Sequence, residues 1–257
     1  MAGPGENNQI SVGKHLLDLI HFKRSQLTYA CLWTLNNLMN YQSGAKNGGS
    51  IADDLLTSGL GPALRVVHSC YRYARDKAKA EKNTLFKYMA PASASDQAGT
   101  VGHKEVIQEL YWFYNYYTSC GPLYSGQLLK QYTELLLFAV DDIVKLAQSP
   151  AKEQDEFAPA DFNPLLMTLA NFIDQSTAEV SSDAAAQESL AILGQAVFTL
   201  VTHQPLFKSL LSIALGSEAQ RRIGLAKHSL YTLSNLLALS HQLSDPNVAA
   251  AVCQTLS

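Results

Sequence analysis

Helical periodicity is the feature that most constrains this chain. In the segment 126–148, GQLLKQYTELLLFAVDDIVKLAQ, apolar residues recur at steps of three and four and form one broad stripe. Period-two alternation, which marks β-strands, does not extend beyond about four residues in the sequence. We therefore predict an all-α fold in which 126–148 is one helix packed on two sides.

The same reading predicts helices along the rest of the chain. Capping residues and glycine or proline stops set their ends. The expected helices cover 11–24, 25–42, 51–57, 62–81, a segment from Lys104, one opened by Asn163 and Pro164, one from Ser182 or Asp183, one from Pro205 to Gly216, one within 217–242 and a last one capped by Asp245 and Pro246.

About ten helices result, joined mostly by loops of about two to eight residues, which makes neighbouring helices antiparallel. Helix pairs recur at roughly 40 to 60 residues, as in degenerate HEAT and armadillo arrays. The fold class that we predict is an α-solenoid of antiparallel helix pairs, HEAT- or armadillo-like, with a compact all-α bundle as the alternative.

The domain organisation follows from composition. The Gly/Pro-rich residues 1–9 are expected to be a leader or disordered, and residues 10–257 to form one module. An Ala/Ser/Gly-rich stretch near 91–103 predicts a flexible loop. The ends suggest a fragment of a longer protein. No window approaches about 18 uninterrupted apolar residues, so we predict no membrane span.

Signals of chemistry are sparse. The four cysteines, Cys31, Cys70, Cys120 and Cys253, are widely spaced without a C-x-x-C pair, which favours a reducing compartment and four small buried side chains. The seven histidines show no metal-binding spacing and are interpreted as ordinary surface or core residues. The sequence therefore predicts no catalytic residue, no metal and no cofactor.

Adjacent carboxylates at Asp141 and Asp142 point about 100° apart on a helix and do not form a pair that shares a proton. We expect both to face solvent, with Asp142 pairing locally with Lys145. Asp53 and Asp54 are interpreted in the same way.

One helix is basic. Arg65, Arg72 and Lys79 recur at seven residues and share a face, with Arg75 beside it. Acidic residues interrupt this face and the net charge is −3, both of which disfavour nucleic acid as a partner. The alternatives are a solvated helix and a patch for an acidic protein, for which Arg72 and Arg75 are the candidate contacts.

The run 111–117, YWFYNYY, has six aromatic residues in seven positions. A helical wheel of this run has no polar face, which predicts a helix buried on most sides. Base stacking would need nearby cations, and 111–123 contains none. Core is the preferred interpretation, and Tyr111, Trp112 and Tyr116 are the candidate residues if part of the run binds a protein.

The segments QLLKQYTELLLFAVDDIVKLAQ and KHSLYTLSNLLALSHQL resemble the C-terminal tail region of the largest inner-ring scaffold nucleoporins of the nuclear pore complex, of fungal type. The resemblance extends from about Ile10 onward and rests on no short diagnostic motif, so no binding residue is transferred from it.

This resemblance implies a karyopherin-like α-solenoid that is not an enzyme. Such a module supports pore architecture and the transport of proteins and mRNA, at the nuclear pore in the nuclear envelope. Its partners would be adaptor or linker segments of other nucleoporins, and transport factors, without a small-molecule substrate. The alternatives are a HEAT- or armadillo-type adaptor or transport-receptor fragment, and an all-α enzyme whose site is assembled from distant residues.

Overall fold

The computed structural model describes residues 11–20, 24–42, 51–81, 103–148, 161–179, 183–216 and 223–242. Helices account for 88 % of this part of the chain, which contains no strand, so the predicted all-α class is confirmed. The predicted leader at 1–9, the predicted loop near 91–103 up to residue 102, and the predicted last helix from Asp245 lie outside these ranges.

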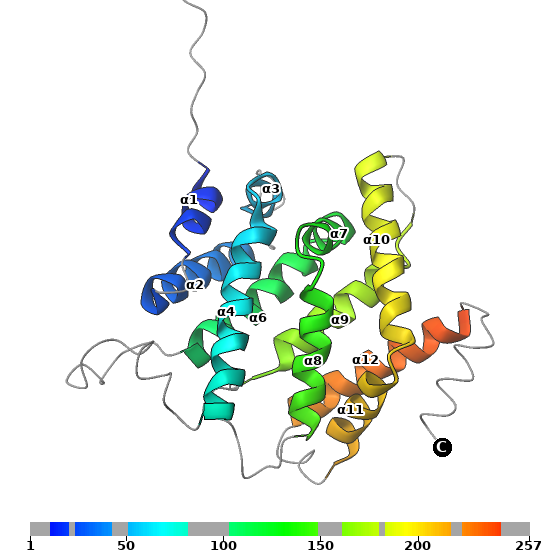
Figure 1. The fold of residues 1–257 in the computed structure, drawn as a ribbon. Coiled ribbons are helices and arrows are strands. Elements are labelled where there is room, and N and C mark those ends of the chain that lie inside the picture. The colour runs from blue at the N-terminus through cyan, green and yellow to red at the C-terminus, as the bar shows by residue number, and fades with distance from the viewer. Residues whose placement is uncertain are drawn as a thin grey trace, which may run out of the picture.

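Eleven helices make up the described ranges (Figure 1). Most begin or end within one or two residues of the predicted positions. Their bounds are α1 Val12–Leu19, α2 Ser25–Gln42, α3 Ile51–Thr57, α4 Leu60–Glu81, α6 His103–Ser119, α7 Pro122–Gln131, α8 Leu135–Gln148, α9 Asn163–Gln175, α10 Ala184–Val201, α11 Gln204–Leu215 and α12 Ile223–Gln242.

The single helix predicted over 126–148 is wrong, because the chain breaks between α7 and α8. Tyr132 leaves the helical conformation at φ −132° and ψ 72°, and a short turn leads into Leu135. Neither glycine nor proline marks the break. Tyr132 is fully buried and its hydroxyl binds another helix, so tertiary packing has overridden the local helical pattern.

The predicted capping role of Asn163 at the start of α9 is wrong. The backbone N–H of Asn163 donates to the Asp161 carboxylate at 2.8 Å, so Asp161 rather than Asn163 binds a free amide at the start of α9. A helix start at Ser182 or Asp183 was predicted, and Asp183 is the N-cap, since its side chain accepts from the Ala185 N–H.

The helices lie in two layers (Figure 1). In the back layer, α2, α6, α9 and α12 lie side by side in chain order. The front layer places α4 beside α7 and α8, followed by α10 and α11, again in chain order. In the back layer, α9 runs parallel to α6, because Asp161 contacts Gln108 and Gln175 contacts Thr118.

Within each layer, three helices begin at a constant spacing in the sequence. The front helices α4, α7 and α10 begin 62 residues apart, and the back helices α6, α9 and α12 begin 60 residues apart. Apolar residues of both layers meet in one continuous core. Side chains at matching back positions are buried in all three helices, as at Val106, Leu166 and Ala226.

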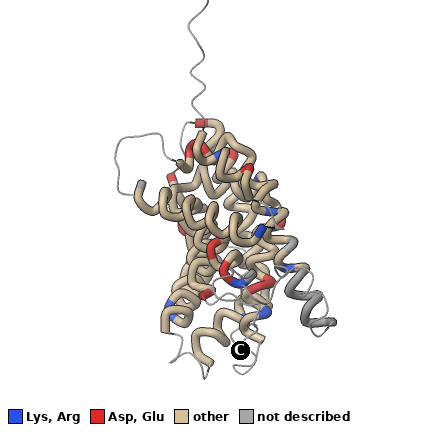
Figure 2. The backbone as a smooth tube through the Cα atoms, turned by 90° about the vertical axis from the view of Figure 1, so that its left-hand side faces the viewer, with Lys and Arg blue, Asp and Glu red and all other residues tan. Residues whose placement is uncertain are grey.

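Charged residues are spread along the helices. In the view of Figure 2, lysine and arginine positions alternate with aspartate and glutamate positions rather than gathering into one block of a single sign. This distribution agrees with the small net charge of −3.

Candidate functional site

The aromatic run on α6 faces a group of polar side chains in the interior between the layers. We call this group the buried polar cluster; its members are His68 and Arg72 of α4, Tyr111 and Tyr114 of α6, Tyr132 after α7, and Asp142 of α8. All except Arg72 are at most 4 % exposed, and the Arg72 side chain is 11 % exposed. Front and back layers therefore meet at a site with charge and hydrogen-bonding capacity.

Asp142 is the principal acceptor of the cluster. Its Oδ2 atom lies 2.5 Å from the Tyr111 hydroxyl and 3.4 Å from His68 Nε2, and its Oδ1 atom lies 3.3 Å from Arg72 Nε. The hydrogen bonds from Tyr111 and His68 and the charge of Arg72 stabilise this buried carboxylate, because its desolvation without partners would cost several kcal/mol. The expectation that Asp142 faces solvent is therefore wrong. Lys145 forms an ion pair with Asp141 at 3.0 Å.

His68 links that carboxylate to two phenols. Its Nδ1 atom lies 2.9 Å from the Tyr132 hydroxyl and 3.2 Å from the Tyr114 hydroxyl. A neutral imidazole with its proton on Nε2 satisfies the network, because Nε2–H then donates to Asp142 and Nδ1 accepts from tyrosine. His68 is thus a core residue with partners on both ring nitrogens, in line with the prediction for the histidines.

Arg72 completes the cluster from the solvent side. Its guanidinium donates to Asp141 as well as lying beside Asp142, and its Cζ atom lies 4.1 Å from the centre of the Phe138 ring. Ion pairing and the cation–π contact hold it against α8. The charge of Arg72 is therefore engaged within the chain, and its assignment to a partner-binding face stays a prediction.

Burial controls the titration of the phenols. Desolvation, followed by the neighbouring Tyr132 and Tyr111, raises the pKa of Tyr114 well above its ordinary value. Desolvation likewise raises the pKa of Tyr132, although Arg72 opposes the shift. Both residues therefore remain neutral hydrogen-bond donors far into the alkaline range.

This geometry limits what the cluster can do chemically. A carboxylate that orients an imidazole is part of many acid–base sites. Here, however, the second imidazole nitrogen already contacts two tyrosines, and the His68 side chain has no exposed surface. The arrangement is suited to joining α4, α6 and α8 rather than to contacting a substrate.

Sequence reasoning missed this cluster, although one signal was present. Asp142 follows Leu135 by seven residues and Ala139 by three, which places it on the buried stripe of α8. On α4, His68 and Arg72 are four residues apart and share a face. No spacing rule linked these two helices, because their pairing depends on the tertiary fold.

The predicted partner-binding residues fall into different environments. Tyr111 is fully buried, so its assignment as a partner contact is corrected: a side chain without exposed surface touches no partner. Trp112 and Tyr116 are half-buried and stack, with ring centres 5.5 Å apart. The side chain of Arg75 lies outside what the structure describes.

The core interpretation of the aromatic run is confirmed for its other members. Phe113, Tyr114 and Tyr117 are at most 1 % exposed. Phe113 and Tyr117 stack one turn apart on α6, with ring centres separated by 5.8 Å.

The basic face of α4 is used in part inside the chain. Arg65 forms an ion pair with Glu134, just before α8, as Arg72 does with Asp141. The face is therefore neither fully solvated nor a free patch at these two positions. The side chains of Lys77, Lys79 and Lys82 are outside the described part.

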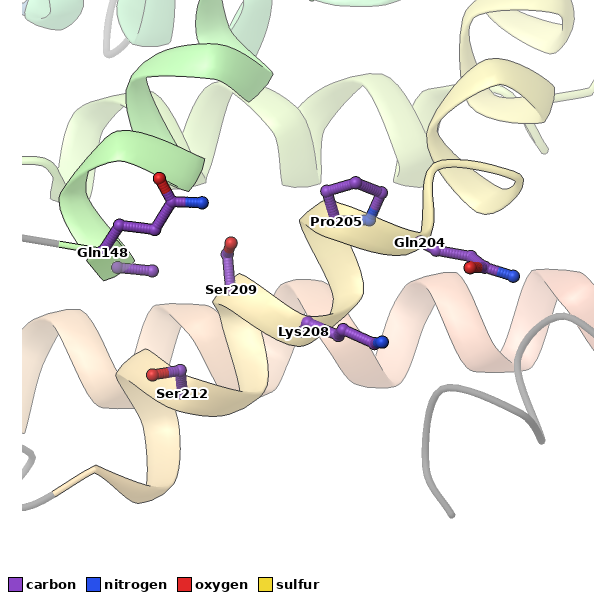
Figure 3. Close-up of a pocket in the computed structure, with 7 residues that line it drawn as sticks. Gln148, Gln204, Pro205, Lys208, Ser209 and Ser212 are labelled. Atoms are coloured by element: carbon purple, nitrogen blue, oxygen red, sulfur yellow. The ribbon is translucent and has the colours of Figure 1, made fainter.

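A shallow pocket of about 350 Å³ lies where the end of α8 meets α11. Figure 3 shows Ser209 on the side of Gln148, whereas Lys208 and Gln204 extend toward the other side of α11. Its lining holds one cation and no carboxylate, which is too little for acid–base chemistry. Among the described residues, no group of three or more His, Cys, Asp or Glu side chains could hold a metal ion.

Two sequence expectations concern cysteines and membranes. Cys31 is buried as predicted, whereas Cys120 is exposed, so the expectation of four buried cysteines is wrong. One described helix, α10, is long and apolar enough to cross a membrane by length and composition alone. Its buried side packs against α7, α9 and α12.

The chain was compared with protein-family models, with curated proteins and with solved structures. None of these three comparisons found a match.

Proposed function

We propose that this chain is a structural scaffold and protein–protein interaction module built as an α-solenoid. The observation that carries the proposal is the ordered two-layer arrangement, in which helices of each layer follow one another at 60- or 62-residue spacing. Arrays of this kind bury a continuous core between neighbouring repeats and leave long helical surfaces for partners.

The direction of the helices supports the solenoid. In the front layer, Arg65 contacts Glu134 and Arg72 contacts Asp141, so α4 and α8 run in the same direction. In the back layer, α9 is parallel to α6, as described above. The helices α6 and α9, which lie at the 60-residue spacing, are therefore parallel, as is typical of equivalent helices in stacked helical hairpins.

The outer side of the back layer offers a surface for a protein partner. Trp33 and Tyr41 of α2 are exposed, and Trp112 and Tyr116 of the adjacent α6 are half-buried. Asn36 of α2 joins the two helices by donating to Glu109. Tryptophan and tyrosine are enriched in binding hot spots, because they provide large, rigid contact areas.

From the resemblance described above, we infer that this scaffold is an inner-ring nucleoporin of the nuclear pore complex. On this proposal the partners are extended or helical segments of other nucleoporins and transport factors, which lie along the helical ridges. The buried polar cluster then fixes the relative orientation of α4, α6 and α8.

Affinity capture of the full-length protein from nuclear-envelope extract tests the proposal. Recovery of pore components is the expected result. Recovery of metabolic enzymes without pore components would contradict the nucleoporin assignment. Recovery of other transport proteins alone would favour the HEAT- or armadillo-type adaptor instead.

A further inference from the structure

The last repeat exposes apolar positions that earlier repeats cover. Leu230 of α12 is 47 % exposed, whereas Leu110 and Ala170, which precede it by 120 and 60 residues, are buried. In the front layer, Leu128 is buried, whereas Leu190, 62 residues later, is half-buried. The difference identifies an exposed apolar flank on the last repeat that the structure describes.

Side-chain partners fix the direction in which this flank faces. Glu188 of α10 pairs with Lys130 of α7, so the side of α10 near residue 188 faces the preceding repeat. At 100° per residue, Leu190 lies about 160° from Glu188, and Phe198 lies about 180° from Ser189, whose hydroxyl donates to the Leu123 carbonyl of α7. Phe198 is 43 % exposed.

The same reasoning applies to α12. Tyr231 and Asn235 donate to Asp174 of α9, which fixes the side toward the preceding repeat. Leu230 and Leu237 therefore lie on the opposite side. We call Leu190, Phe198, Leu230 and Leu237 the terminal flank; all four are apolar and partly exposed.

We propose that residues 246–257 of this chain form a helix that docks on the terminal flank as the next front-layer element, an inference that rests on the repeat architecture proposed above. A fourth front helix at the 62-residue spacing would begin at position 246. Asp245 and Pro246 are the cap and first-turn residues expected there. The 62-residue spacing and the capping residues are independent observations, and both give the same start for this helix.

The chemistry of the segment matches that of the flank. Residues 246–257, PNVAAAVCQTLS, contain no charged side chain, and Val248, Val252 and Leu256 recur at four residues to give one apolar stripe. The terminal flank is likewise uncharged. End repeats of helical arrays need a cover for their outer apolar face, because an open face favours association.

Hydrogen–deuterium exchange of the full 257-residue chain tests this docking. The peptide covering 246–257 is expected to exchange slowly, and Leu230→Glu or Phe198→Glu is expected to accelerate its exchange at least about tenfold. Leu137→Glu is the matched control, since Leu137 is an exposed leucine on α8, away from the flank. This control should leave the peptide protected, and peptides from α6 should stay protected in every variant.

Two results would overturn the proposal. The first is a 246–257 peptide that exchanges at the rate of unstructured chain while α6 stays protected; the repeat architecture would then survive without the docked segment. The second is a solution mass near twice 28.0 kDa together with protection of the flank that is lost on dilution, which would assign the flank to a second copy of the chain. Loss of α6 protection in the unmodified chain would instead contradict the proposed scaffold itself.

Discussion

Two contacts between helices of the front layer, which we call joints, are held together by different chemistry. Between α4 and α8, the joint contains His68, Arg72 and Asp142, closed by tyrosine hydroxyls from α6 and the end of α7. Between α7 and α10, Gly126 lies directly against Ser189, so that an added Cβ would sit 2.4 Å from the Ser189 Cβ.

The comparison separates two sources of specificity. The α4–α8 joint, which we call the polar joint, fixes the orientation of the helices through directional hydrogen bonds and is sensitive to the loss of any one partner. The α7–α10 joint, which we call the tight joint, fixes the distance between the two helices by close packing and is sensitive to added atoms. Two helix contacts in the same layer can therefore be sensitive to opposite kinds of substitution, namely the loss of a polar group in one and the addition of atoms in the other.

Removal of the shared acceptor, Asp142, should destabilise the polar joint most. Asp142→Ala leaves Arg72, His68 and Tyr111 without their shared carboxylate, and is expected to lower the free energy of unfolding by about 3–5 kcal/mol. Urea denaturation followed by circular dichroism measures the loss. Asp141→Ala is the neighbouring control; its side chain is 40 % exposed, so a loss below about 1 kcal/mol is expected. Equal losses in both variants would show that burial of Asp142 is not decisive.

The tight joint should break on the addition of one methyl group. Gly126→Ala places its Cβ against the Ser189 backbone, which cannot rotate away, and is expected to cost about 1–3 kcal/mol despite the better helix propensity of alanine. Gly224→Ala is the control, because its nearest neighbour at 3.2 Å is the end of the Asn163 side chain. A Gly126→Ala variant as stable as the parent would contradict the close approach of α7 and α10.

Alkaline pH should lower the free energy of unfolding, because the tyrosines of the polar joint stay neutral in the folded chain and ionise in the unfolded chain. The pKa of Tyr114 and that of Tyr132 are raised from the ordinary 10.0 by burial. Their contribution is therefore complete below pH 10 and is lost as pH rises above it, where the unfolded phenols ionise first. The free energy of unfolding should fall by about 1.4 kcal/mol per pH unit for each such tyrosine.

Denaturation at pH 9 to 11 measures this slope. Tyr114→Phe should make it shallower, whereas Tyr73→Phe, at an exposed position, should not change it. An identical slope in the Tyr114→Phe variant would argue against a buried, neutral phenol at this joint.

The smallest effect is expected at the solvent-exposed edge of the tight joint. Lys130 contacts Glu188 at 2.8 Å, but both side chains are about half exposed. Lys130→Met should therefore change the free energy of unfolding by less than about 1 kcal/mol, and by still less in high salt. A loss as large as that of Asp142→Ala would mean that the two joints do not differ in the way described.

Much of the fold was predictable because local patterns determine it. The helices at 25–42 and 51–57 were predicted at their observed ends, and the aromatic run was placed in the core. The break after Gln131 was not predictable from neighbours in sequence. It depends on Tyr132 reaching His68, a contact between residues 64 positions apart.

The buried polar cluster could be predicted only in part. Helical phase places Asp142 on the apolar stripe of α8, but a carboxylate at that phase is ordinarily interpreted as exposed. Its burial becomes favourable only when Arg72 and Tyr111 arrive from two other helices. Long-range pairing of this kind has no periodic signal in one sequence.

Affinity capture with paired variants tests the central claim most directly, namely that helix surfaces rather than the buried cluster carry the function. The doubly substituted Trp112→Ser/Tyr116→Ser chain should stay helical and lose at least one partner class from nuclear-envelope extract. The Tyr132→Phe chain, altered only inside the cluster, should keep all partners. Retained partners in the surface variant together with lost partners in a folded Tyr132→Phe chain would contradict the account.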